Sequence, residues 1–104
     1  MFIGLFCSAV LAGSCQSEQA YIDDPQAGDI YLFEASETYF PVRVDYVEDD
    51  YVYCNNSRYV FENDFPEWDD MPATEFDYSF HHIYEKSEIQ KLYQEQKIVK
   101  VYRE

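Results

Sequence analysis

The residues of this chain that could carry chemistry are mainly acidic, and many of them lie in one loop-like stretch. Calcium takes six to eight oxygen ligands, usually from alternate residues around a turn that glycine permits. Residues 63–77, which include the acid-rich loop predicted at 63–75, have no glycine and no Asp-x-Asp-x-Asp-Gly order. We therefore expect no metal site there, and interpret its acids as solvated or facing a partner: Asp64, Glu67, Asp69, Asp70, Glu75 and Asp77.

Two adjacent histidines, His81 and His82, are the next candidates for metal ligation. Successive residues of a strand point to opposite faces of the sheet, so the two imidazoles are poorly placed to hold one ion. One histidine together with Tyr84 or a loop acid could still do so. We expect instead one half-buried and one exposed histidine, with no metal bound.

Catalytic arrangements are missing from the sequence. A hydrolase that works with two carboxylates needs them held across a cleft. Because the chain has 21 acidic residues, finding a pair of them in the sequence is no evidence for such a site. There is no Ser/His/Asp order, no glycine-rich phosphate loop and no Cys–His dyad. We expect no catalytic residue, no cofactor and no enzymatic activity.

The charge distribution indicates the kind of partner. The formal net charge is −14, with 18 acidic and two basic residues between positions 16 and 85. Such a charge repels nucleic acid and anionic lipid, and leaves cationic proteins, cationic ligands or divalent metal ions as candidate partners. Aromatic side chains among charges are typical of binding hot spots. We expect the partner to bind an acidic turn and the acid-rich loop, at Glu48, Asp49, Asp50, Phe65, Glu67, Trp68, Asp69 and Asp70.

The elements that must hold these residues are mostly short strands. Apolar and polar residues alternate with the period of a strand, which puts Ile30 and Leu32 on one face and Tyr31 and Phe33 on the other. By the same alternation we place Phe40, Val42, Val44 and Tyr46 on one face. The predicted strands are residues 30–34, 38–48, 51–54, 58–62, 76–84 and 98–102.

Two connections complete the prediction. Asn55, Asn56 and Ser57 favour a tight hairpin turn, because asparagine tolerates positive φ. Residues 86–96 have a helical pattern, with a capping box at Ser87 and Gln90. The fold class is therefore mainly β (β+α): a small SH3-like barrel or a curled antiparallel sheet of five to six strands, with one short C-terminal helix before the last strand.

The N-terminal segment differs from the rest. Residues 2–12 form an uncharged apolar run of the length of a signal-peptide core. The run Leu11-Ala12-Gly13-Ser14-Cys15 that follows resembles the lipobox of bacterial lipoproteins. The resemblance implies that residues 1–14 are a signal peptide, that Cys15 is lipidated, and that residues 15–26 are a polar tether to a single domain at 27–104.

Two alternatives stay open for this segment. Ala12-x-Ser14 also matches an ordinary export cleavage site, which would release a soluble secreted protein. Cys15 and Cys54 could then form a disulfide in an oxidising compartment, whereas with Cys15 lipidated Cys54 is a lone thiol. The segment could also be a buried N-terminal strand or helix.

These features together favour a non-catalytic acidic lipoprotein of the bacterial cell envelope, exported and anchored to the membrane, that binds a basic protein. A toxin-neutralising immunity protein is one class with these properties. The alternatives are a structural or accessory envelope lipoprotein, or a module for sugar or metal that uses Trp68 and the loop acids.

Overall fold

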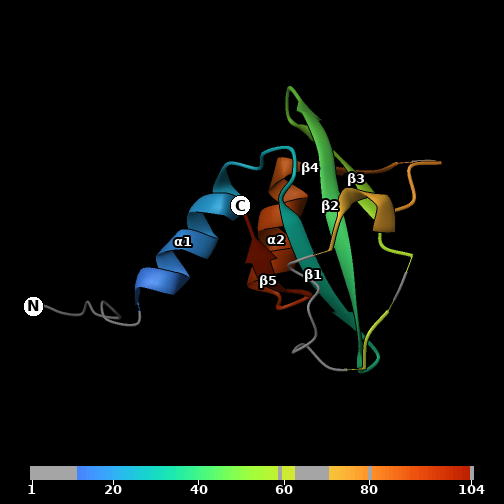
Figure 1. Ribbon diagram of the computed structural model, residues 1–104. Coiled ribbons are helices and arrows are strands. Elements are labelled where there is room, and N and C mark those ends of the chain that lie inside the picture. Colours follow the sequence, from blue (N-terminus) through green and yellow to red (C-terminus); the bar gives the residue numbers. More distant parts are fainter. Residues whose placement is uncertain (1–11, 59, 63–70, 80, 104) are drawn as a thin grey trace, which may run out of the picture.

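The computed structural model describes residues 12–58, 60–62, 71–79 and 81–103, with side chains from residue 18 onward. Two α-helices, five strands and one short 3-10 helix make up the described part (Figure 1). In chain order they are α1 (Ala12–Asp23), β1 (Ile30–Ala35), β2 (Thr38–Glu48), β3 (Tyr51–Asn56), η2 (Ala73–Glu75), β4 (His82–Glu85), α2 (Lys86–Gln94) and β5 (Ile98–Tyr102).

The five strands form one antiparallel sheet in the order β4-β3-β2-β1-β5. The predicted mainly β fold with a helix before the last strand is confirmed. Of the two predicted architectures the open sheet is the correct one, because β4 and β5 lie at opposite edges and do not pair with each other. The predicted bounds of β2 and β5 are those of the structure.

The two faces of the sheet carry separate apolar clusters. On the face covered by the helices, Tyr31, Val42 and Val52 are fully buried against Ile22 of α1 and Ile89 of α2. We call this the helix face and its opposite the outer face. The outer face holds the second cluster, in which Ile30 and Leu32 pack against Phe76. The predicted alternation in β1 is therefore confirmed, and Figure 1 shows α1 and α2 on one side of the sheet and η2 on the other.

A β-bulge changes the alternation inside β2. Val44 pairs with Cys54, but the next pair is Tyr46 with Tyr53, so Asp45 is an extra residue on the β2 side. An inserted residue shifts all later side chains by one position. The prediction that Tyr46 shares a face with Val44 is therefore wrong. Val47 packs on the helix face instead, and Tyr46 is exposed on the outer face.

The predicted turn at Asn55 is also wrong. Asn55 and Asn56 belong to β3, where they pair with Arg43 and Val42 of the long strand β2. Asn55 is fully buried. Turn preference is a local tendency, and pairing with β2 overrides it. The chain leaves β3 at Ser57, whose N–H donates to the carbonyl of Pro41.

The two strands predicted on either side of the acid-rich loop are mostly absent from the described residues. In 58–62, only Phe61 makes a bridge, with Tyr39 of β2. In 76–84, Phe76 makes one bridge with Ser57, and regular strand begins only at His82. These segments instead cover the outer face with Phe61 and Phe76.

Helix α2 begins where β4 ends. Its capping box joins Glu85 and Glu88, with the carboxylate of Glu88 accepting from the N–H of Glu85, and not Ser87 and Gln90 as predicted. The helix directs Ile89 into the core. It ends at Gln94, two residues earlier than predicted, because Gln96 adopts a positive φ of 63°.

The segment predicted as a polar tether is helical as far as Asp23. Ile22 is fully buried. The Glu18 carboxylate accepts hydrogen bonds from the Tyr93 hydroxyl of α2 at 3.1 Å and from the Val101 N–H of β5 at 3.5 Å. The packed part of the chain therefore starts before residue 27. Among the described residues, no helix has the length and apolarity needed to cross a bilayer.

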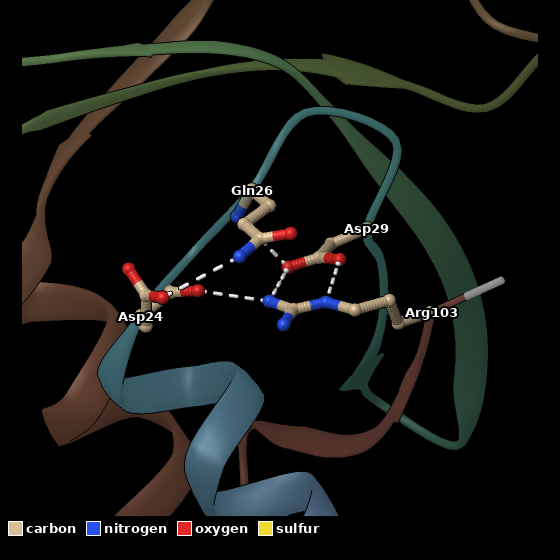
Figure 2. A network of polar contacts seen from close by, with 4 residues as sticks. All are labelled: Asp24, Gln26, Asp29 and Arg103. Atoms are coloured by element: carbon tan, nitrogen blue, oxygen red, sulfur yellow. Dashed lines mark hydrogen bonds and ion pairs between the residues drawn. The ribbon is translucent and has the colours of Figure 1, made fainter.

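A buried ion pair closes the fold between its first loop and its last residues (Figure 2). Arg103 donates from Nε to Asp29 Oδ1 at 2.7 Å and from Nη2 to Asp29 Oδ2 at 2.8 Å. The same Nη2 donates to the carbonyl of Asp24, while Gln26 N–H donates to Asp29. The guanidinium of Arg103 also lies 4.2 Å from the ring centre of Tyr21. The hydrogen bonds to Asp29 raise the pKa of Arg103 above its ordinary value.

Replacing Arg103 with alanine should lower the free energy of unfolding by about 3 kcal/mol, because a buried carboxylate that loses its partner is strongly destabilising. The Asp29 side chain is only 1% exposed. Urea unfolding followed by circular dichroism measures the effect. Lys97→Ala, which removes a positive charge from an exposed site, should change stability by less than about 0.5 kcal/mol. Equal losses in the two variants would contradict the role of the pair.

Candidate functional site

Three side chains line up across β2, β3 and β4 on the outer face. Tyr46 pairs with Tyr53, and Tyr53 pairs with Ile83. We call these three residues the outer row. Tyr46 is 41% exposed and Ile83 54%, with Tyr53 half-buried between them. Large apolar side chains that are both exposed and contiguous mark interaction sites more often than scattered ones do.

The outer row is exposed because other elements stop short of it. Strand β1 pairs with β2 only as far as Arg43, so no strand lies beside Tyr46 on that side. Phe61 and Phe76 pack over Ile30 and Leu32, which belong to β1 and lie away from the outer row. Figure 1 shows the tip of the β2–β3 hairpin projecting beyond the start of β1.

The rings of the outer row are held in a fixed arrangement. Tyr46 and Tyr53 are stacked, with ring centroids 4.4 Å apart and 11° between the planes. His81 lies edge-on to both, at 5.5 Å from Tyr46 and 5.7 Å from Tyr53. Stacked and edge-on geometries are the favourable ones for aromatic pairs. His81 Nε2 in turn lies 2.9 Å from Asp45 Oδ2, which fixes the imidazole.

Carboxylates lie at the bulge and on the side of the outer row nearest the β2–β3 turn. Asp45 lies at the bulge, and the next row of the same face is Glu48, Tyr51 and Glu85, with Tyr51 exposed between the two acids. Partial desolvation raises the pKa of Tyr46 above its ordinary value, and nearby Tyr53, Glu48 and Asp45 raise it further. This end of the sheet is therefore both aromatic and negatively charged.

The predicted binding residues are only partly described. Glu48 ends β2, and Asp49 and Asp50 form the exposed turn to β3, with Asp49 at a positive φ of 57°. The Asp50 carbonyl accepts from Lys86 N–H, which ties this turn to the start of α2. The other five, Phe65, Glu67, Trp68, Asp69 and Asp70, lie outside the described residues. Cys15 lies within α1, with its side chain also outside the description.

The outer row was only partly anticipated from the sequence. In the structure the predicted acid Glu48 pairs with Tyr51 and lies on the same face as Tyr46. The alternation predicts Tyr46 on the opposite face, with Val44. The exposure of Tyr46 follows only from the position of the bulge. Arg43 and Asp45 both alternate with apolar residues, so no residue of this run marks the bulge in the sequence.

The histidines differ from expectation as well. His81 and His82 are both partly buried, where one exposed histidine was expected. His81 contacts Asp45, but no third ligand joins them: within the described ranges no three His, Cys, Asp or Glu side chains gather as a metal site would require.

Cys54 is the remaining candidate for a nucleophile among the described residues. It is a free thiol, fully buried on the helix face beside Val52 and Val44. Burial raises the pKa of Cys54 to about 12. The thiolate is the reactive form of cysteine, so this group is inert near neutral pH. Tyr31, also fully buried, has its pKa raised by the same desolvation.

Stability should fall steeply in alkali because of these two groups. The folded state holds the Cys54 proton more tightly than the unfolded state, whose pKa is about 9. Its contribution is therefore complete below pH 9 and is lost as the pH rises toward 12. On its account the free energy of unfolding should fall by about 1 kcal/mol between pH 9 and 10, and by up to about 1.4 kcal/mol per pH unit above that.

Urea unfolding at several pH values tests this expectation. Cys54→Ala should show a shallower fall between pH 9 and 10 than the unchanged protein, with Tyr31 adding to the slope of both above pH 10. An identical slope in the two proteins would show that the Cys54 thiol does not titrate with unfolding.

The outer face thus combines exposed aromatic rings, one aliphatic side chain and nearby carboxylates. This composition is typical of the central residues of protein interfaces. Comparison of the chain with protein-family models, with curated proteins and with solved structures finds no match in any of the three. Its function is therefore inferred from these residues and their geometry.

Proposed function

We propose that this protein is a non-catalytic binding protein whose outer face, at the β2–β3–β4 end of the sheet, binds a basic protein. The observation that carries the proposal is the exposed outer row with carboxylates beside it. Tyr46 and Ile83 supply apolar contact area. Asp45 and Glu48 supply charge on the same surface.

The arrangement of the rings supports binding at this surface. Stacked Tyr46 and Tyr53, with His81 against both, already hold one conformation. A surface that is ordered before the partner arrives loses little conformational entropy on binding. The acids of the β2–β3 turn extend the negative potential beyond the outer row, which accelerates encounter with a cationic protein.

The lipobox-like run that ends at Cys15 supports a proposal for the cellular setting. We propose that Cys15 is lipidated and that the protein is held in the bacterial cell envelope, with neutralisation of a basic toxin as its most specific form. Helix α1 carries Cys15 and lies on the helix face of the sheet. An anchor attached there leaves the outer face turned away from the element that carries the lipid.

A binding experiment tests the function. Immobilised protein should retain a partner of positive net charge from an envelope or secreted fraction, and its affinity should fall at least about tenfold between 50 and 300 mM salt, because exposed charges are screened. A partner of neutral or negative charge, or binding that salt leaves unchanged, would contradict the proposal.

Matched charge variants locate the surface. Glu48→Gln with Asp49→Asn removes two carboxylates beside the outer row and should weaken binding by about tenfold. Glu34→Gln with Glu62→Gln removes the same charge from two exposed positions near the opposite end of the sheet and should leave affinity within about twofold. Equal loss in both double variants would place the binding surface elsewhere.

A further inference from the structure

We propose that Tyr46 and Asp45 form a subsite for a single arginine side chain of the basic partner. The proposal rests on the proposed function, because it takes the outer face as the partner-facing one. It goes further in naming the group recognised, a guanidinium, and the two side chains that receive it.

The Tyr46 ring is covered on one face. Tyr53 stacks on that face with the ring centroids 4.4 Å apart, and His81 lies edge-on to the ring. Backbone pairing on the β1 side of β2 ends at Val44, which bonds Gly28 and Asp29, two residues before Tyr46. Tyr46 is 41% exposed, and we infer that the exposed part includes the ring face turned away from Tyr53. A cation over such a face is attracted by the π electrons of the ring.

Two carboxylates, of Asp45 and Glu48, lie close enough to Tyr46 to act on its hydroxyl. Asp45 directly precedes Tyr46, and its Oδ2 is the oxygen next to His81 Nε2. Glu48 lies two residues beyond Tyr46, in the next row of the same face. Partial desolvation and, further, Tyr53, Glu48 and Asp45 raise the pKa of the Tyr46 hydroxyl, which agrees with this proximity.

Arginine fits this arrangement better than lysine does. The guanidinium is planar, stacks on an aromatic ring and still directs its N–H groups outward in the same plane to carboxylates. An ammonium group is a compact, strongly hydrated charge that cannot do both. Charge complementarity supports a cationic occupant: residues 44–57 contain four acids and no Lys or Arg.

The test compares two labelled peptides that differ only in the cation. Each has a glycine–serine backbone with four basic residues, arginine in one and lysine in the other, and binding to the full chain is measured by fluorescence anisotropy. We expect the arginine peptide to bind about fivefold more tightly. Equal binding of the two would overturn the subsite and leave the proposed function standing, whereas binding of neither would count against both.

Variants of Tyr46 assign the preference to its ring. Tyr46→Leu should abolish the arginine preference, while Tyr46→Phe, which keeps the ring, should retain it. Tyr78→Leu is the matched control, since Tyr78 is also an exposed tyrosine, at 42%, and should leave the preference unchanged. Asp45→Asn should reduce it. A preference that survives Tyr46→Leu, or that Tyr78→Leu removes equally, would overturn the proposal, and unfolding curves of each variant establish that it is folded.

Discussion

The carboxylate of Asp29 is the point on which this small fold closes. It is buried at the entrance to β1, it receives two N–H groups of Arg103 and one of Gln26, and its own backbone pairs with Val44 of β2. A charge without water must be satisfied completely to be tolerated. Meeting that requirement fixes three distant pieces of chain at once: the end of α1, the start of the sheet and the residues that follow β5.

The β2–β3 hairpin extends, uncovered, beyond this corner of the sheet. Strand β2 is the longest strand and runs past β1, and the bulge at Asp45 turns Tyr46 out onto the face that the helices do not cover. The exposed aromatic surface thus arises from a mismatch in strand length and one extra residue. The same extra residue directs Val47 onto the helix face, so the bulge shapes the core and the exposed surface together.

The sequence predicts the strands that alternate cleanly and fails where tertiary contacts decide. β1, β2, β5 and α2 were found because their apolar periods are regular. The bulge was missed because one inserted residue leaves no mark on composition, and Tyr46 was therefore assigned to the wrong face. Asn55 was assigned to a turn from its local preference, whereas pairing with Arg43 holds it in β3. Ile22 is one apolar residue in a polar segment, too little to predict packing.

The site was predictable to a similar degree. An acidic turn at Glu48 to Asp50 follows from its composition and its position between two strands. The partnership of that turn with Tyr46, His81 and Ile83 depends on register across three strands, which no local pattern encodes.

The contact of Glu18 with Val101 has a consequence for how copies of this protein meet. Strand β5 is an edge strand of the sheet, and edge strands offer unpaired backbone groups to other chains. The Glu18 carboxylate occupies the Val101 N–H, and α1 runs alongside. The last turns of α1 therefore cover part of this edge, and a second sheet that approached it would find the Val101 N–H already engaged.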